Sequence, residues 1–199
     1  MRVDGFELRA VDSFVAEPTS VEDCVGNCLT NQVNGVPVSC VSFNHFVFDD
    51  RCVMLSQRVT PTGNGGQLTE EADASYFEKV CVNSVLAENC PVATQLDRFK
   101  DMTLVGFTER STTTASLELC LEICLDSVAR YAFVCRSALF VHRPNLPPGE
   151  DNCLLNSLDH VDEPSAFMPD PLGQVEYFSV APCAEGGCRS PMPVTGLGE

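Results

Sequence analysis

The sequence contains no tryptophan, three histidines and few basic residues, with 12 Lys and Arg against 28 Asp and Glu in 199 positions. The resulting formal charge of −16 at pH 7 argues against nucleic acid, heparin-like polyanions and anionic membrane surfaces as partners of the chain as a whole. This argument concerns net charge, and a local basic patch stays compatible with it.

Long apolar runs are also missing. Every apolar stretch is interrupted by a polar residue or a cysteine well before the roughly 18 residues that a membrane helix needs, so the sequence predicts no membrane span. Asp4 stands where the apolar part of a secretory leader should begin. We therefore expect the chain to be an excised piece of a larger protein whose leader lies upstream of Met1.

Cysteine, by contrast, is abundant, with 12 residues in the chain. Small extracellular domains rely on disulfides because a short chain buries too little apolar surface to offset its conformational entropy. A site in which four thiolates hold a metal ion is the alternative. The Cys-x2-Cys pair typical of such sites does not occur, and a four-ligand site leaves other cysteines unexplained. We therefore predict disulfides and an extracellular location, with neither a metal site nor a cofactor.

The most informative feature of the sequence is an internal repeat. Residues 20–29 and 116–125 place apolar residues or cysteines at the same five positions, with the i, i+3, i+4, i+7, i+8 spacing of a helix that buries one face. Thr19 or Ser20 can cap the first predicted helix, and Thr114 or Ser116 the second. Each helix carries a Cys-x3-Cys pair on its buried face.

Further landmarks surround each predicted helix in the same order. The corresponding features of the two copies are Gly5-Phe6 and Gly106-Phe107, Cys40 and Cys135, Cys52 and Cys153, Gly66-Gln67 and Gly173-Gln174, Tyr76-Phe77 and Tyr177-Phe178, and Cys81 and Cys183. The sequence therefore predicts two modules, residues 1–81 and 90–183, with a linker at 82–89 and a flexible, Pro- and Gly-rich tail at 184–199.

Short β-rich segments accompany each predicted helix. Residues 41–48 alternate with the strand period and place Phe46 and Phe48 on one face, and residues 138–141 are their counterpart in the second copy. One helix with several short strands predicts an α+β fold, in which the helix lies across a small antiparallel sheet.

The cysteines of each helix are placed to reach two neighbouring strands. We expect nested bridges, namely Cys28–Cys40 inside Cys24–Cys52 and Cys124–Cys135 inside Cys120–Cys153, although six cysteines allow 15 arrangements. Cys90 and Cys183 bracket the second module and are expected to join its ends. Cys81 and Cys188 stay unassigned: Cys81 is free, pairs with Cys188 or, as we favour, pairs with a cysteine upstream of Met1.

This ordered set of motifs resembles the PAN/apple family. The resemblance depends on the helix with Cys-x3-Cys, the cysteine-containing strand that follows, the strand at Cys52 or Cys153, and the Tyr-Phe strand. Residues 120–155 look especially like PAN modules of invertebrate zona-pellucida-type and cuticle matrix proteins. The resemblance implies a curved antiparallel sheet cradling one helix, nested helix-to-strand disulfides, and binding of proteins or carbohydrates. The first module departs from the pattern because it lacks an N-terminal cysteine.

Residues that could carry other chemistry are better explained as structural. The histidines, His45, His142 and His160, do not recur at equivalent places, so no thiol–imidazole dyad is predicted. Acidic clusters at residues 49–50 and 159–163 lack the alternating ligands of a calcium loop. Residues 63–66 are interpreted as a turn, and Arg136 as a solvated or locally paired charge.

We therefore predict a non-enzymatic, extracellular module pair without catalytic residues. Its surfaces are expected to bind a protein or glycan as part of a larger secreted or membrane-anchored matrix protein. A structural spacer without a ligand of its own is the alternative, and an enzyme or metal sensor remains a hypothesis only if the thiols are free. The sequence assigns no ligand-binding residue, although the Pro-containing insertion at 141–152 is a candidate for module-specific binding.

Overall fold

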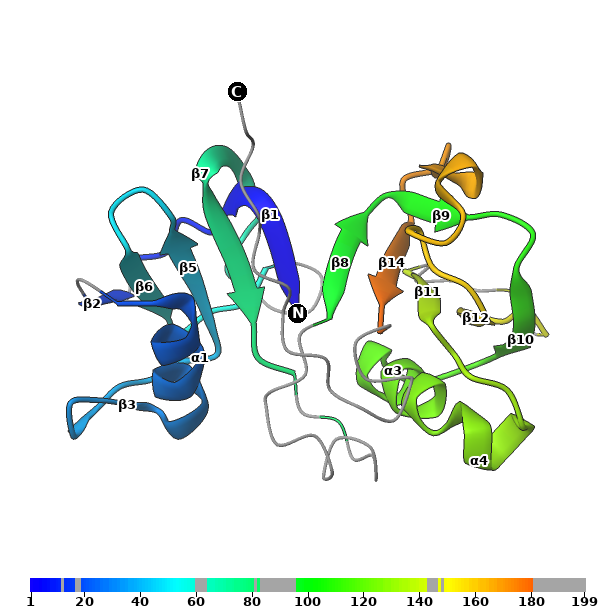
Figure 1. Ribbon diagram of the computed structural model, residues 1–199, viewed down its shortest axis with the longest axis horizontal. Coiled ribbons are helices and arrows are strands. Elements are labelled where there is room, and N and C mark those ends of the chain that lie inside the picture. Colours follow the sequence, from blue (N-terminus) through cyan, green and yellow to red (C-terminus); the bar gives the residue numbers. More distant parts are fainter. Residues whose placement is uncertain are drawn as a thin grey trace. The chain divides into compact units, whose positions relative to one another are not determined.

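The computed structural model describes residues 1–11, 13–16, 19–59, 64–80, 82, 96–142, 147 and 149–180 (Figure 1). The chain divides into two compact units. One comprises Met1–Cys81 with Asp97–Phe99, and the other comprises Val82–Leu96 with Lys100–Glu199. The linker at 82–89 and the tail at 184–199, which were inferred from the sequence, stay predictions.

The first unit is an antiparallel sheet with one helix packed on it. Its elements are β1 (Arg2–Glu7), β2 (Ser13–Ala16), α1 (Val21–Thr30), β3 (Gln32–Val33), β4 (Val36–Pro37), β5 (Ser42–Phe46), β6 (Arg51–Leu55) and β7 (Thr69–Glu78). Five strands follow the order β1-β7-β5-β6-β2, and each neighbouring pair is antiparallel. The helix α1 lies against β5 and β6 (Figure 1), and β3 and β4 form a separate short hairpin after it.

The second unit has the same plan. Its elements are β9 (Met102–Leu104), β10 (Thr108–Thr112), α3 (Leu117–Leu125), α4 (Ser127–Tyr131), β11 (Ser137–Val141), β12 (Cys153–Asn156), η1 (Pro164–Ala166), β13 (Phe167–Pro169) and β14 (Val175–Ser179). The strand β8 (Asp97–Lys100) precedes them, and its residues Asp97–Phe99 belong to the first unit. The antiparallel order is β10-β12-β11-β14, and β9 pairs with β13. The α+β class predicted from the sequence is confirmed.

Serine side chains begin the two longer helices. The hydroxyl of Ser20 accepts a hydrogen bond from the main-chain N–H of Asp23 at 3.1 Å, and the hydroxyl of Ser116 accepts one from Leu119 at 3.3 Å. An acceptor at this position satisfies one of the amide groups that a helix leaves without a partner in its first turn. The structure thus selects the serine from the two candidates at each helix.

Four disulfides join the helices to the sheets. The structure contains Cys24–Cys52 and Cys120–Cys153, with Cα atoms 6.1 and 5.6 Å apart, and Cys28–Cys40 and Cys124–Cys135, with Cα atoms 5.1 and 5.3 Å apart. All eight cysteines are buried. Each bridge ties a helix covalently to its sheet, and it typically contributes about 2–4 kcal/mol, mainly because it restricts the unfolded chain.

The central strand β5 does not alternate as residues 41–48 were expected to. All five of its residues are buried, because β5 lies between β6 and β7 in the sheet and α1 packs against it. The strand ends at Phe46, and the N–H of Phe48 bonds the side chain of Asp73. The expectation that Phe46 and Phe48 share a face is therefore wrong: Phe48 lies in a turn and is 93% exposed.

The two Gly-Phe pairs do not occupy equivalent positions either. Gly5 lies inside β1, at an irregularity in its pairing with β7, and has a φ of 76°. Gly106 instead follows β9. In the second unit the chain turns at Asp101, between β8 and β9, where φ is 55°. A similar dipeptide near the start of each copy therefore marks different structural positions.

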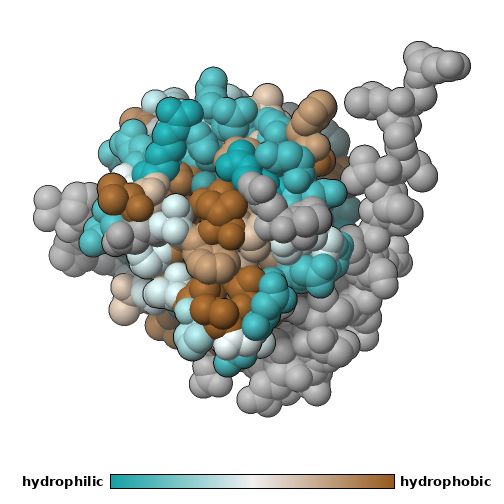
Figure 2. Space-filling model, turned by 90° about the vertical axis from the view of Figure 1, so that its left-hand side faces the viewer, coloured by the Kyte–Doolittle hydropathy of each residue, from teal (hydrophilic) through white to brown (hydrophobic). Residues whose placement is uncertain are grey.

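The first unit also exposes apolar side chains. β2 is the edge strand of its sheet, and its residues Phe14 and Val15 are 37% and 50% exposed. Figure 2 shows the side on which β2 lies, with apolar residues gathered near the middle of a largely hydrophilic face. A sheet edge with exposed apolar side chains is a surface to which another chain can add.

Candidate binding groove

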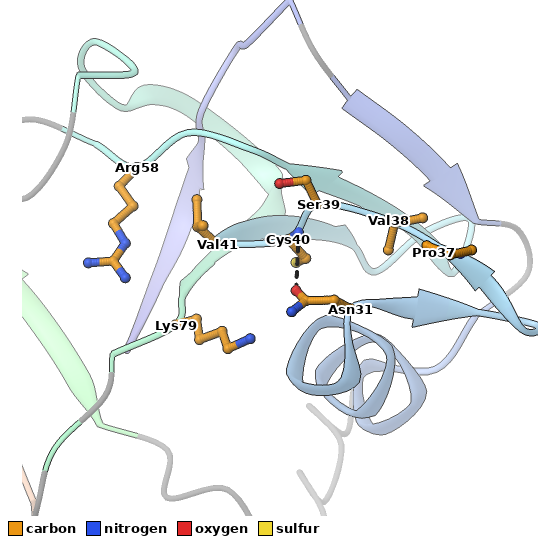
Figure 3. Close-up of a pocket in the computed structure, with 8 residues that line it drawn as sticks. All are labelled: Asn31, Pro37, Val38, Ser39, Cys40, Val41, Arg58 and Lys79. Atoms are coloured by element: carbon orange, nitrogen blue, oxygen red, sulfur yellow. Dashed lines mark hydrogen bonds between the residues drawn. The ribbon is translucent and has the colours of Figure 1, made fainter.

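An open groove lies beside the Cys28–Cys40 disulfide of the first unit (Figure 3). Its volume is about 520 Å³, and eight described residues line it: Asn31, Pro37, Val38, Ser39, Cys40, Val41, Arg58 and Lys79. In Figure 3, Arg58 and Lys79 lie toward one end, and Pro37 and Val38 lie toward the other. We call this feature the basic groove, because it has one cationic end and one apolar end.

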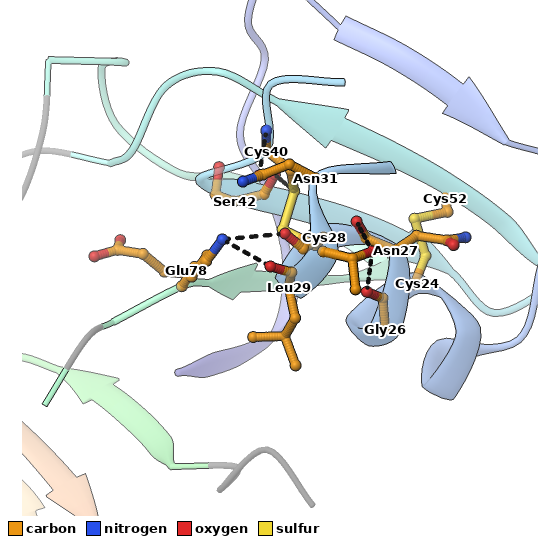
Figure 4. Close-up of a disulfide and its surroundings, with 12 residues drawn as sticks. Cys24, Gly26, Asn27, Cys28, Leu29, Asn31, Cys40, Ser42, Cys52 and Glu78 are labelled. Atoms are coloured by element: carbon orange, nitrogen blue, oxygen red, sulfur yellow. Dashed lines mark hydrogen bonds between the residues drawn. A yellow bond between two sulfur atoms is a disulfide. The ribbon is translucent and has the colours of Figure 1, made fainter. Parts of the chain in front are cut away.

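Lys79 is held at the groove by its main chain and its side chain. The residue follows β7 directly, and its N–H donates to the carbonyl of Val41 at 2.9 Å. Its ammonium donates to the carbonyl oxygens of Cys28 and Leu29 at 3.2 and 3.3 Å. Figure 4 shows these two residues beside the Cys28–Cys40 disulfide. The helix α1 has no basic residue in its last turn, so Lys79 supplies the positive charge that the C-terminal end of a helix favours.

Asn31 links the end of α1 to the disulfide. It has a left-handed conformation with φ of 54°, and its Oδ1 accepts a hydrogen bond from the N–H of Cys40 at 3.3 Å. With the amide turned over, its Nδ2 donates to the carbonyls of Cys28 and Cys40 at 3.3 and 3.1 Å. In both orientations the amide bonds main-chain groups of its own domain. Arg58 and Lys79 are the charged residues among the eight that line the groove.

Two hydrogen bonds fix the segment that carries Arg58. The hydroxyl of Ser42 donates to the carbonyl of Gln57, and the hydroxyl of Tyr76 accepts from the N–H of Val59 at 3.1 Å. Burial, with a smaller effect of the neighbouring Glu78, raises the pKa of Tyr76, so its hydroxyl stays neutral. The main chain on both sides of Arg58 is thus tied to the central strands.

A glycine completes the support of this segment. The N–H of Gly65 donates to the carbonyl of Arg58 at 2.7 Å. A Cβ at position 65 would lie 2.6 Å from that carbonyl oxygen, closer than a side-chain carbon can approach. Only glycine allows this contact without a shift of the chain. The interpretation of residues 63–66 as a turn stays a prediction: residues 64 and 65 form a bend, and residue 63 lies outside the described part.

The second unit repeats the same supporting contacts. The hydroxyl of Ser137 donates to the carbonyl of Leu158 at 2.7 Å, and the hydroxyl of Tyr177 accepts from the N–H of His160 at 2.8 Å. The N–H of Val180 donates to the carbonyl of Arg136 at 2.8 Å, as Lys79 does to Val41. These matching bonds make Asp159, Val180 and Arg136 the equivalents of Arg58, Lys79 and Val41.

At these equivalent positions the second unit pairs its own charges. Arg136 contacts Asp159 through Nη2 and Oδ2 at 3.4 Å, and Asp162 through Nε and Oδ2 at 3.0 Å. Asp159 is buried, and its Oδ1 also accepts from the N–H groups of Val161 and Asp162 at 2.8 and 3.0 Å. The first unit has Arg58, Lys79 and Val41 at the positions of Asp159, Val180 and Arg136 in the second.

The histidines lie in structural contacts. His45 is buried on β5 and bonds the carbonyl of Thr19 at 3.1 Å, and Nε2 of His142 lies 3.3 Å from Oε2 of Glu176. His160 packs against the ring of Tyr177. Within the described ranges, no group of three or more His, Cys, Asp or Glu side chains could hold a metal ion.

The part of the chain that the structure describes contains no helix with both the length and the apolar character that crossing a membrane requires.

The structure covers only some of the residues singled out in the sequence. Eight of the cysteines form the helix-to-strand bridges given above, whereas Cys81, Cys90, Cys183 and Cys188 lie outside the described residues. The same applies to residues 143–146 and 148 of the insertion at 141–152. The basic groove was not predicted, because Arg58 and Lys79 are single basic residues that belong to no motif. Arg58 and Lys79 stand out only when the two copies are aligned on their shared serines and tyrosines.

Comparison with known proteins agrees with this architecture. The model of the PAN domain family matches residues 1–81 and 90–183. The chain is also 35% identical over 180 residues to a Caenorhabditis elegans protein with the name "Uncharacterized protein F52C9.5". That match covers 90% of this chain and 27% of the relative, so the chain spans about a quarter of the relative's length. PAN domains are modules that bind proteins or carbohydrates. The chain belongs to the PAN domain family and carries two such domains in tandem.

Proposed function

We propose that the chain is an extracellular pair of PAN domains that binds a protein or carbohydrate partner and catalyses no reaction. In this proposal it is part of a larger secreted or membrane-anchored matrix protein of the zona-pellucida-like or cuticle type. The basic groove carries the proposal. It is an open concave surface lined by charged and apolar side chains whose positions the fold fixes.

The extracellular location is supported by the disulfides. The two small domains contain four disulfides whose sulfur atoms are buried. Disulfides persist in oxidising compartments. The C. elegans relative, of which the chain spans about a quarter, supports membership of a larger protein.

Exposed apolar residues of the first domain support a protein partner. Phe48 projects from a turn at 93% exposure, and Phe14 and Val15 lie on the edge strand β2. Aromatic side chains that are exposed in the free protein are frequent anchors of protein interfaces. Two domains on one chain can also raise the affinity for a repetitive partner, because the second contact forms at a high effective concentration.

A spacer role is the second candidate, and it is favoured for the second domain by the network of Arg136, Asp159 and Asp162. In this network the charged side chains of the second domain pair with one another. In this variant of the proposal the first domain binds the partner and the second sets its distance from the rest of the protein.

A binding screen tests the proposal. The full chain, produced in an oxidising secretory host, is immobilised and exposed to arrays of extracellular proteins and of glycans. We expect saturable binding to at least one class, and loss of that binding when Arg58 is replaced by Gln but not when the exposed Arg9 is. A folded chain that binds nothing on either array would contradict the proposal and favour the spacer role for both domains.

A further inference from the structure

We propose that the second domain binds an acidic sugar with one carboxylate on an exposed surface formed by Arg110, Tyr131 and Phe133. We call these three side chains the aromatic platform. The inference rests on the proposed binding function and names a ligand class for the second domain. It does not involve the basic groove, and it assigns a ligand to the domain for which a spacer role is the alternative.

The aromatic platform joins an edge strand to the end of a short helix. Arg110 lies on β10, at the edge of the sheet, and its Cζ lies 5.1 Å from the centroid of the Tyr131 ring at the end of α4. The rings of Tyr131 and Phe133 are stacked, with centroids 6.4 Å apart and planes inclined by 22°. The structure describes residues 96–142 without a gap, so both segments that carry the platform are defined.

A turn at Ala132 brings the two rings together. Ala132 has a φ of 61°, and its N–H donates to the carbonyl of Val128 at 3.1 Å, where α4 ends. Nearly parallel rings at a separation of 6.4 Å are offset, so each leaves part of its face uncovered. Both rings are half-buried, and Val128 beside them is exposed. The domain therefore holds the rings in place without enclosing them.

Arg110 differs from the other described basic residues of the second half of the chain. Residues 90–199 contain 15 acidic and 7 basic residues. Four of the five described bases form ion pairs, which are Arg98 with Glu78, Lys100 with Asp101, Arg130 with Asp126, and Arg136 with Asp159 and Asp162. Arg110 is exposed and forms no ion pair with a described residue. Its contact with a ring leaves N–H groups of the guanidinium for a carboxylate, which Arg can bind through two parallel hydrogen bonds.

The first domain lacks the aromatic platform although it shares the fold. Phe14 lies two residues before the pairing partner of Cys52 on β2, and Arg110 lies two residues before the pairing partner of Cys153 on β10. Phe14 therefore stands at the position of Arg110. After its helix the first domain has the β3–β4 hairpin where the second has α4. Because the common fold forms without the platform, its three side chains are free to serve a ligand.

The three side chains match the groups of an acidic sugar. A pyranose presents a flat face of C–H groups, which can pack on the open parts of the two rings, and its carboxylate is attached directly to that ring. Tyr131 has ring contacts with Arg110 and Phe133 and no hydrogen bond from its hydroxyl to a described residue, so this hydroxyl can bond a sugar hydroxyl. A rigid ring also loses less conformational entropy on binding than an acidic side chain of a flexible peptide.

The net charge of the domain limits the ligand to one carboxylate. Residues 90–199 have an excess of eight acids, so a sulfated or repeatedly carboxylated polymer would be repelled beyond its contact with Arg110. A single acidic sugar at the end of an otherwise neutral glycan places its charge at the guanidinium and adds no further repulsion. We therefore assign the platform to a terminal acidic sugar.

The test is a titration of the ¹⁵N-labelled full chain with four probes, followed by amide chemical shifts. The probes are methyl glucuronoside, its uncharged amide, acetate, and the capped peptide N-acetyl-Gly-Asp-Gly-amide. We expect methyl glucuronoside to shift the amides of residues 109–111 and 128–134 and to bind less tightly as salt is raised. The sugar amide, which lacks the charge, and acetate, which lacks the ring, should each bind about tenfold more weakly.

Two variants separate the guanidinium from the rings. Arg110→Gln should remove the preference for the acid over its amide, whereas Phe133→Leu should weaken both sugars about threefold to tenfold and keep that preference. Lys100→Gln is the matched control, because it removes one positive charge from an exposed position outside the platform and should leave the affinity unchanged. The preserved amide spectrum of each variant reports that it has folded.

Four results would overturn the inference. They are equal affinity for the acid and its amide, shifts confined to residues outside the platform, equal weakening by Lys100→Gln, and tighter binding of the Asp peptide, which would assign the platform to a protein carboxylate. The comparison of probes on the parent chain holds even if a variant fails to fold. A chain that binds a partner on the arrays but neither sugar would leave the proposed function intact and would refute only this inference.

Discussion

The ammonium of Lys79 lies 3.2 Å from the carbonyl oxygen of Cys28. A residue that directly follows β7 thus bonds the C-terminal end of α1, which lies some 50 positions earlier in the sequence. The same side chain lines the basic groove. Stability of the first domain and the charge of its surface are therefore coupled through one residue.

Replacing Lys79 by Met should destabilise the first domain. The variant keeps the aliphatic part of the side chain but removes the cation from the carbonyls of Cys28 and Leu29, and we expect a loss of about 1 kcal/mol in the free energy of unfolding. Urea unfolding of both proteins measures the difference. Lys100→Met is the matched control, because Lys100 is exposed and contacts only Asp101 among the ion pairs described. An equal loss in both variants would show that the helix end is not the cause.

Two Gly→Ala substitutions should change stability in opposite directions. At Gly65 the new Cβ would meet the carbonyl oxygen of Arg58 at 2.6 Å, so the turn must shift and we expect a destabilisation of about 1–3 kcal/mol. At Gly26, inside α1, a Cβ meets nothing within 4 Å, and Ala should stabilise by about 0.5–1 kcal/mol. Thermal unfolding of the two variants and of the parent protein measures both changes in stability. A stabilising Gly65→Ala would mean that the contact with Arg58 is not made.

Tyr177 should give the second domain a characteristic loss of stability at high pH. Burial raises the pKa of Tyr177 from 10.0 to about 12. Between these two values the unfolded chain loses the hydroxyl proton while the folded domain retains it. The contribution of Tyr177 is therefore fully present below pH 10 and is lost as the pH rises toward 12.

The Tyr177→Phe variant isolates this effect. Its free energy of unfolding should fall less steeply between pH 10 and 12 than that of the parent, as measured by urea unfolding soon after the pH change, with the disulfides intact. Below pH 9 the variant should be less stable, because the N–H of His160 loses its acceptor at 2.8 Å. An identical pH slope in the two proteins would contradict the expectation.

Peptide mapping should find the nested disulfides. Digestion of the oxidised protein without reduction should link Cys24 to Cys52, Cys28 to Cys40, Cys120 to Cys153 and Cys124 to Cys135. None of these eight cysteines should react with a thiol reagent in the native protein, because all are buried and bridged. A fragment that joins Cys24 to Cys28 would refute the arrangement in the first domain.

The helices and their attachment could be predicted because the relevant signals are local. Cys24 and Cys28 are one helical turn apart, and the same spacing recurs at Cys120 and Cys124, so the buried face of each helix is visible in the sequence alone. Ser20 and Ser116 mark the helix starts for the same reason, since a cap acts within three residues.

The limits of β5 depended on tertiary contacts. Apolar residues continue through Val47 and Phe48, but the strand stops at Phe46, because the chain turns there toward β6 and Asp73 on a neighbouring strand bonds the N–H of Phe48. Burial of all five residues of β5 follows from its central place in the sheet, which the strand period does not reveal.

The groove was missed because its residues come together only through the pairing of distant segments. Arg58 follows β6, Lys79 follows β7 and Asn31 ends α1. The connection between β11 and β12 is longer than that between β5 and β6, so constant spacing does not align the two copies. The alignment becomes clear only from the hydrogen bonds of Ser42 and Tyr76 and of their counterparts Ser137 and Tyr177.

The groups that form these shared hydrogen bonds differ from the side chains that line the groove. Ser and Tyr hydroxyls and main-chain atoms hold the segment in both domains, and none of these groups belongs to the side chains at positions 41, 58 and 79 or at 136, 159 and 180. Exchange of those side chains leaves the shared hydrogen bonds in place, while Lys79 and Asp159 also bond main-chain groups of their own domain. A duplicated domain of this design can therefore acquire a new specificity, or lose one, in a few substitutions while its twin keeps the original.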